Sequence, residues 1–254
     1  MSTQTSPRIL CLALPDWPVQ HYLQRHPEHK PYALVFSKQV GRSEQVVSCS
    51  DRARQLGISS GMRTPDAEAL AGPNQLTILP CRPLDDCQGL RALAAACHRF
   101  SPVVALENAT APAALLLDAN GLSPLWAATQ QQGELRLLQA VDLWSRQQQL
   151  TVSAAIAQTP GLAWAGAHFP AWLAGRSADQ RMIANGHSLE AAQVLPIEAL
   201  RIDESTINTL VSLGIERIGQ LLALPKADLL SRFGPQLGWR MDQLLGQAAE
   251  PLSF

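Results

Sequence analysis

The sequence lacks the patterns that mark zinc-binding, secreted and membrane proteins. Its five cysteines form no C-x-x-C pair and have no histidine at zinc spacing, so we expect reduced, buried thiols and a cytoplasmic protein. The N-terminus has no basic head followed by a long apolar run, and Gln158, Pro160, His168 and Pro170 interrupt the apolar stretch at 150–175. We therefore expect neither a signal peptide nor a membrane span.

The sequence also lacks an excess of positive charge and the motifs of common hydrolases. Its net charge of -1 argues against a protein that coats nucleic acid by bulk charge, although a local basic patch stays possible. It contains no Gly-rich phosphate loop and no G-x-S-x-G motif. His21, His26 and His29 lie near Glu28, but their spacing fits neither a zinc finger nor a metalloprotease helix. We expect no metal and no cofactor.

What the chain does have is enough apolar sequence for a sizeable core, 46% of 254 residues, and a recognisable order of elements. Leaving out a β-rich insertion with strands at 32–36 and 45–49 and a helix at 52–57, the order is β-α-β-β-α-β. That order predicts an α/β (α+β) protein with a ferredoxin-like antiparallel sheet covered by helices on one face. The elements are a strand at 9–14, a helix at 84–100, strands at 103–106 and 113–117, a helix around 137–144 and a strand at 150–156.

The C-terminal part of the sequence predicts a helical module. Thr159 followed by Pro160 is typical of a helix N-cap and first turn, and this helix is expected to end near Gly175. After Pro196, short apolar periodic segments are separated by Gly and Pro. They predict helices at about 205–213, 218–224, 226–232 and 235–246.

A turn between two of these helices is a candidate for DNA contact. In the helix-hairpin-helix pattern, glycines flank a short apolar turn whose backbone N–H groups can bind a phosphate. The alternative is an ordinary helix–helix corner, because 201–254 carries five Lys/Arg against six Asp/Glu. A second candidate is 25–63, with seven Lys/Arg against three Asp/Glu, for which a solvated basic face is the alternative. The candidate DNA-binding residues of the turn are Gly214, Ile215, Arg217, Ile218 and Gly219.

Several motifs, in register over nearly the whole chain, resemble the Y family of DNA repair polymerases. The turn at 213–221 resembles that family's thumb hairpin, and a fingers motif is matched by Val46-Val47-Ser48-Cys49-Ser50, Ala53-Arg54, Gly57-Ile58 and Ser60-Gly61-Met62. The resemblance implies a palm at 1–25 plus 76–165, fingers at 26–75 and a helical thumb at 166–254. Other segments resemble the ImuB branch, namely Ala157, Thr159-Pro160-Gly161, Ala163-Trp164, Leu195-Pro196, Ala199-Leu200-Arg201, Leu222-Ala223-Leu224-Pro225, Arg232-Phe233-Gly234 and Glu250-Pro251-Leu252-Ser253.

The chain departs from the Y family at the positions that carry polymerase chemistry. Nucleotidyl transfer uses two divalent ions held by carboxylates, and the resemblance aligns those carboxylates with Ala13, Ala113 and Ala114. The family's lysine aligns with Trp164, and its tyrosine near the nucleotide aligns with Asp51. Arg54 is the remnant that matches a phosphate-contacting arginine. These departures imply a degenerate polymerase that is not an enzyme.

The ImuB resemblance implies an adaptor role in damage-induced mutagenesis as part of the SOS response, at DNA in the cytoplasm (nucleoid). The implied partners are damaged or primer-template DNA, an error-prone replicative-type polymerase, the sliding clamp and a small accessory protein. The little-finger domain and the C-terminal tail of these families are absent from the 254 residues. One alternative is a weakly active polymerase in which Glu107, Asp118 and Asp16 regroup around metal. Another is a protein-interaction scaffold without DNA affinity.

Overall fold

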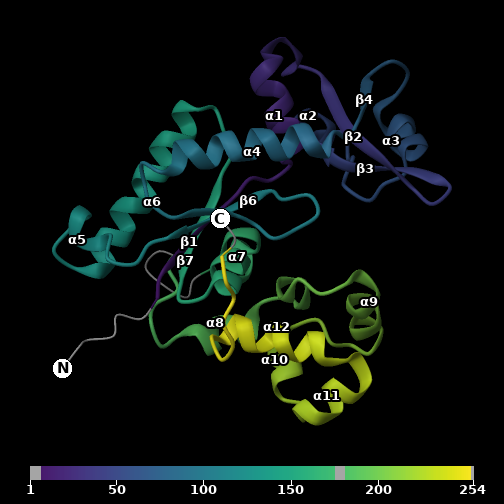
Figure 1. Cartoon of the computed structure of the whole chain (residues 1–254). Coiled ribbons are helices and arrows are strands. Elements are labelled where there is room, and N and C mark those ends of the chain that lie inside the picture. The colour runs from purple at the N-terminus through teal and green to yellow at the C-terminus, as the bar shows by residue number, and fades with distance from the viewer. Residues whose placement is uncertain (1–6, 175–180, 253–254) are drawn as a thin grey trace, which may run out of the picture.

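The computed structural model describes residues 7–174 and 181–252 and shows a central sheet that joins two further modules (Figure 1). The central sheet has the strand order β5-β6-β1-β7, and each pair of neighbours is antiparallel. With helices α4 and α6 in the chain order, this is the ferredoxin-like palm that the sequence predicts. The strands are β1 (Ile9–Ala13), β5 (Val104–Leu106), β6 (Ala114–Asp118) and β7 (Ser153–Ala157).

The continuous apolar run of β1 is explained by a sheet that is covered on both faces. Leu10 and Leu12 point to one face, where α4 (Pro83–Cys97) and α6 (Gln130–Gln147) supply a core that includes Leu90 and Leu138. Cys11 and Ala13 point to the other face, toward α7 (Pro160–His168) and the C-terminal helices. A short helix, α5 (Ser123–Trp126), precedes α6.

The helical module follows β7 and lies at the lower right of Figure 1. Thr159 caps α7 as predicted, since its Oγ1 accepts a hydrogen bond from the N–H of Leu162 at 3.1 Å. The helix ends at His168, before Pro170, and so earlier than the predicted end near Gly175, which itself lies outside the described residues. The predicted run of short helices is confirmed. The module contains η2 (Pro170–Leu173), α8 (Ser188–Val194), η3 (Ile197–Leu200), α9 (Glu204–Ser212), α10 (Ile218–Leu222), α11 (Lys226–Phe233) and α12 (Pro235–Leu245).

The inserted module is built on a second sheet with the order β3-β2-β4. Strand β4 pairs with β2 in parallel, so it belongs to the inserted module, whereas the sequence-based division at residue 76 placed it in the palm. Ser50 caps α2 by accepting the N–H of Ala53 at 3.3 Å, and Ala53 packs with Val35 and Val46. The elements are β2 (Ala33–Val40), β3 (Ser43–Cys49), α2 (Asp51–Gln55), α3 (Thr64–Ala71) and β4 (Leu76–Pro80).

A helix that the sequence analysis missed, α1 (Trp17–Arg25), connects the two sheets. The prolines at 15 and 18 end β1, but Pro18 also occupies the first turn of α1, where its missing N–H costs nothing. The helix leads through η1 (Pro27–His29) into β2. Among the described helices, none combines the length and apolarity that a membrane span requires.

Candidate functional site

The centre of the palm carries two alanines side by side. Ala13 of β1 and Ala114 of β6 are partners in the antiparallel register, and their side chains are 2% and 0% exposed. Ala113 precedes β6, and its carbonyl accepts a hydrogen bond from the N–H of Leu14 at 2.8 Å. The positions at which the family resemblance expects carboxylates are therefore neighbours in the sheet, but the methyl groups of Ala13 and Ala114 lie in the core on the α7 side, whereas Ala113 packs against the core on the other face.

An indole and a carboxylate lie next to these alanines. The Nε1–H of Trp164, on α7, donates to Oε1 of Glu107 at 2.8 Å. The other oxygen of Glu107 accepts the N–H of Ala113 at 3.0 Å. Trp164 stacks on His168 with 3.8 Å between ring centroids, and the guanidinium of Arg201 lies 5.4 Å from the Trp164 ring. The indole is therefore packed against both an imidazole and a guanidinium, and both oxygens of the carboxylate are hydrogen-bonded.

The C-terminal segment after α12 adds an ion pair to this cluster. Glu250 binds Arg201 at 2.7 Å, and Arg240 of α12 lies 3.6 Å from the same carboxylate. The Arg201 and Glu250 side chains are mostly buried, at 16% and 13% exposed. The pair ties the segment after α12 to the indole on the palm face.

Burial favours the neutral forms of two titratable groups near the alanines, Cys11 and His168. Burial raises the pKa of the Cys11 thiol well above its ordinary value, with a further rise from Glu107 and an opposing effect from Arg201. Burial also lowers the pKa of His168, whose Nδ1–H donates to the Trp164 carbonyl at 2.9 Å. A neutral thiol is a poor metal ligand, because metals bind the thiolate.

The other acidic side chains that could regroup around metal lie apart. Asp118 pairs with Ile9 at the far end of β1, four residues and about 13 Å from Ala13 at the usual rise of a strand. Its carboxylate accepts the N–H of Asn120 at 2.8 Å. In the part of the chain that the structure describes, no group of three or more His, Cys, Asp or Glu is placed to hold a metal ion.

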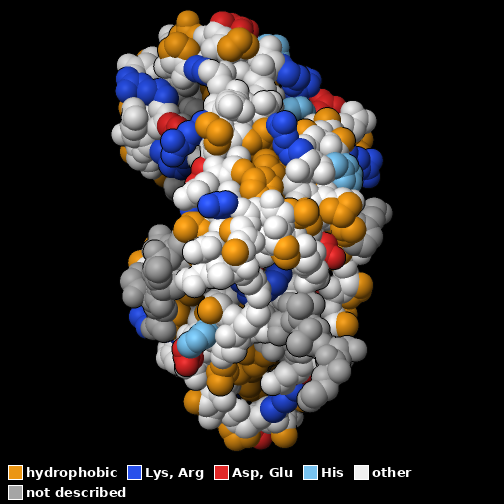
Figure 2. Space-filling model, turned by 90° about the vertical axis from the view of Figure 1, so that its left-hand side faces the viewer, with side chains coloured by type: hydrophobic (Ala, Val, Ile, Leu, Met, Phe, Trp, Pro, Cys, Tyr) orange, Lys and Arg blue, Asp and Glu red, His pale blue; other side chains and the backbone are white. Residues whose placement is uncertain are grey.

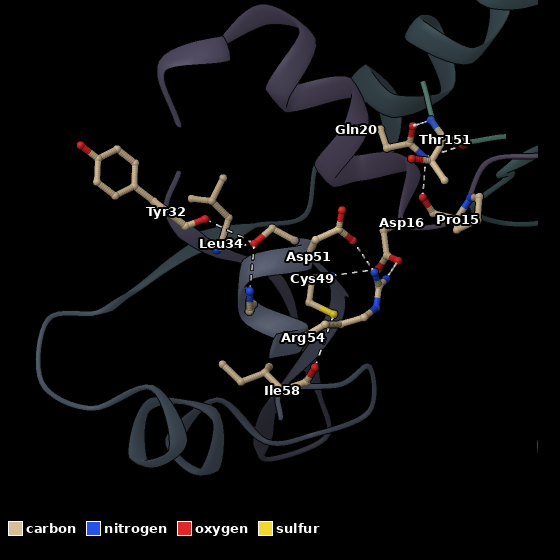
Figure 3. Close-up of polar contacts among 12 residues, drawn as sticks. Pro15, Asp16, Gln20, Tyr32, Leu34, Cys49, Asp51, Arg54, Ile58 and Thr151 are labelled. Carbon is tan, nitrogen blue, oxygen red and sulfur yellow. Dashed lines mark hydrogen bonds and ion pairs between the residues drawn. The ribbon is translucent and has the colours of Figure 1, made fainter. Parts of the chain in front are cut away.

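In the fingers, Arg54 is already engaged by carboxylates (Figure 3). Its guanidinium forms an ion pair with Asp16 and binds Asp51 at 3.0 Å. The other oxygen of Asp16 accepts the N–H of Cys49 at 2.9 Å, which links the start of α1 to β3. A cavity of about 280 Å³ lies beside this group, lined in part by Lys30. The sequence suggested Asp16 only as one of the carboxylates that could regroup around metal, and its role as the partner of Arg54 was missed.

A larger cavity of about 570 Å³ lies between the fingers and the palm. Ala113 and Pro112 line it from the palm, and Val47 and Ser48 line it from β3. The Ser48 hydroxyl is buried and makes no hydrogen bond to any described residue. It is a site residue that the sequence analysis quoted only as part of a motif.

The predicted DNA-binding residues lie together in the turn between α9 and α10. Gly214 has a φ of +78°, which a side chain would strain, and Gly219 lies against the backbone of α8. Ile218 is buried, while Arg217 is exposed. Arg217 is therefore the member of the set whose side chain is most accessible to a partner.

The basic residues of 25–63 do not all present free charge. Arg54 and Arg63 are bound to acidic side chains, and Lys30 donates to the Gln149 side chain at 3.0 Å. Figure 2 shows Lys and Arg side chains spread over the upper part of one face, with other side chains between them. On this face the cations are dispersed.

Comparisons with known proteins show the family to which the chain belongs. Residues 17–168 match the impB/mucB/samB family. The chain belongs to this family. Within the impB/mucB/samB family it is similar to Protein ImuB from two Caulobacter vibrioides strains, NA1000 / CB15N and ATCC 19089 / CIP 103742 / CB 15. Identity to each is 39% over 201 residues, which is 78% of this chain and 40% of the relative. The chain thus spans about two fifths of the length of these relatives.

Solved structures of Y-family polymerases share the fold of this impB/mucB/samB family member. DinB from Sulfolobus solfataricus superimposes with a TM-score of 0.68 at 16% identity, over 96% of this chain and 69% of that chain. An insertion ternary complex of Dbh DNA polymerase gives the same values. The predicted resemblance to Y-family polymerases, and to ImuB among them, is confirmed.

Proposed function

We propose that this chain is a non-catalytic Y-family protein that acts as a DNA- and partner-binding adaptor in translesion synthesis. The observation that carries the proposal is the Ala13–Ala114 pair at the centre of the palm. Two divalent ions need several carboxylate oxygens fixed on rigid strands, and methyl groups supply none. Glu107, the nearest carboxylate, accepts hydrogen bonds from the indole N–H of Trp164 and the backbone N–H of Ala113.

The nucleotide side of the site supports the same proposal. Arg54 is bound by Asp16 and Asp51, so an incoming triphosphate would meet two carboxylates beside its only matched cation. These two carboxylates would repel the negatively charged triphosphate. Trp164 stands at the lysine position and packs against His168. A weakly active polymerase would have to rearrange all of these contacts.

The adaptor role itself follows from the relation to ImuB. In this proposal the turn at 214–219 and the 25–63 region contact damaged or primer-template DNA at the nucleoid. The protein partners would be an error-prone replicative-type polymerase, the sliding clamp and a small accessory protein. A scaffold that binds protein partners without DNA is the second candidate, favoured by the near-neutral charge of 201–254.

Two assays on the purified chain test the proposal. Primer extension with Mg²⁺ or Mn²⁺ should give no product, and fluorescence anisotropy with primer-template DNA should show saturable binding that weakens steeply with salt. Metal-dependent extension that Glu107→Gln abolishes would establish the weakly active polymerase instead. Absence of binding at about 50 mM salt, where phosphate contacts are strong, would leave the scaffold.

A further inference from the structure

The backbone N–H groups of residues 214–218, in the turn between α9 and α10, are hydrogen-bonded inside the protein. Oε1 of Gln220 accepts the N–H groups of Glu216 and Arg217, at 2.9 and 2.8 Å. The N–H of Ile218 donates to the carbonyl of Leu195 at 3.0 Å, and that of Ile215 donates to the carbonyl of Leu210 at 3.0 Å. A phosphate at this turn would have to displace these bonds. The expected capture of phosphate by backbone donors therefore has little support here.

The donor that stays accessible is the side chain of Arg217. Its backbone is fixed, because Arg217 forms an isolated antiparallel bridge with Pro196 and the flanking N–H of Ile218 is bound to Leu195. The side chain is exposed, and no ion pair joins it to an acidic residue in the described ranges 7–174 and 181–252. Its fork of N–H donors matches the oxygens of a phosphodiester.

An aromatic ring holds the guanidinium of Arg217 in place. The guanidinium carbon lies 5.3 Å from the ring centroid of Trp172, within the range of a cation–π interaction. Trp172 is 38% exposed, whereas its neighbour Leu173 is 2% exposed and anchors η2 in the core. The stack restricts the rotamers of Arg217 before any ligand arrives, which lowers the ordering cost of binding.

We propose that Arg217, positioned by Trp172, makes the phosphate contact of this turn and that the backbone N–H groups of residues 214–218 do not. The proposal rests on the proposed DNA binding and names the group that carries it in the thumb. The ligand is one backbone phosphate of a nucleic acid, read without regard to base sequence. A single contact fits the surroundings, since 201–254 carries five Lys/Arg against six Asp/Glu.

The chain contains a matched control for this residue. Arg232 of α11 is also an exposed thumb arginine, and its guanidinium lies 5.7 Å from the ring centroid of Phe233. Arg232→Ala and Arg217→Ala remove the same charge from the same module next to an aromatic ring. Only Arg217→Ala removes it from the turn. A difference between these variants therefore reports on position rather than net charge.

The test is anisotropy with fluorescent primer-template DNA across a salt series, after circular dichroism has shown that each variant melts like wild type. Removing one phosphate contact lowers the slope of log K against log salt by about 0.9. The ratio of the DNA affinity of wild type to that of Arg217→Ala should therefore fall about 3.5-fold between about 50 and 200 mM salt. Arg232→Ala should keep the wild-type slope.

Variants at Trp172 test the positioning role. Trp172→Leu should weaken binding without changing the salt slope, because the charge of Arg217 stays. Trp172→Phe should restore affinity, since a phenyl ring can also stack on the guanidinium. Equal affinities and slopes for Arg217→Ala and Arg232→Ala would overturn the inference while leaving DNA binding intact. If the wild-type chain does not bind DNA at about 50 mM salt, the proposed DNA binding is overturned as well.

Discussion

Placing a carboxylate at Ala13 tests whether the palm centre is a packed core or an open metal pocket. The site is buried, its register partner is Ala114, and the nearest cation of the cluster, Arg201, is already paired with Glu250. A carboxyl group introduced by Ala13→Asp would have no partner there. We expect it to take up a proton rather than remain ionised in the folded state.

The magnitude follows from the shift in pKa. Desolvation at a fully buried position raises a carboxyl pKa by about 3 units, from about 3.9 to about 7, and each unit corresponds to 1.36 kcal/mol. The variant should therefore lose about 4 kcal/mol of unfolding free energy at pH 7. Because the folded pKa is the raised one, the loss grows by about 1.4 kcal/mol per pH unit between about pH 4 and 7.

Urea denaturation at several pH values, with Ala13→Asn as control, measures this effect. The asparagine has nearly the same shape and no charge, so the difference between the two variants isolates ionisation. That difference should be near zero at pH 4 and about 4 kcal/mol at pH 7. The reasoning would be refuted if the unfolding free energy of Ala13→Asp at pH 7 were within about 1 kcal/mol of that of the control and rose further when Mn²⁺ was added. That result would show that the site is a solvated metal pocket.

Three further outcomes follow from other sites. Glu134→Gln should lower the unfolding free energy by about 3–5 kcal/mol in urea, because it leaves Arg8 charged and buried without its 2.6 Å partner. Gly219→Ala should cost about 1–3 kcal/mol and lower the thermal midpoint, since a methyl group there would lie 2.7 Å from the carbonyl oxygen of Gln193. Cys97 should resist alkylation by iodoacetamide at pH 8, as followed by mass spectrometry of the native protein, because burial raises its pKa to about 12.

Two of these outcomes have a counterpart in the same chain. Arg63→Ala breaks only the exposed ion pair with Asp66, so it should lower the unfolding free energy by no more than about 1 kcal/mol. If Glu134→Gln lowered the unfolding free energy by the same small amount, the predicted contribution of the buried Arg8–Glu134 pair would be wrong. An unchanged midpoint for Gly219→Ala would mean that α8 and α10 separate without cost. Cys87, which is half-buried, should react first, and equal labelling of Cys97 would contradict its burial.

The palm and the C-terminal helices could be predicted because their signals are local. The run at 9–14 is apolar throughout and forms a buried strand. Gly and Pro separate the short C-terminal helices, and the helix predicted at 205–213 occurs at Glu204–Ser212. Ala13 of β1 also lies opposite Ala114 of β6, as the predicted pairing of two apolar strands allows. Local pattern was sufficient for these features.

The features that the sequence did not reveal depend on contacts between distant segments or on a proline whose effect on secondary structure is ambiguous. Proline at 18 can end a strand or begin a helix, and tertiary contacts select the second in α1. Strand β4 has no alternating pattern, and its parallel pairing with β2 is set by the sheet. The Asp16–Arg54 pair joins residues 38 positions apart, which no local period reveals.

The core on the α7 side of the palm has a consequence for how the chain unfolds. Cys11 and Ala114 share one continuous cluster with Leu210, Leu221 and Leu244 of the C-terminal helices. A shared core couples the stability of the segments that form it, so palm and thumb should melt in one cooperative transition. Expressing the palm alone would expose the inner face of β1 and β6 to water, and we expect that fragment to aggregate.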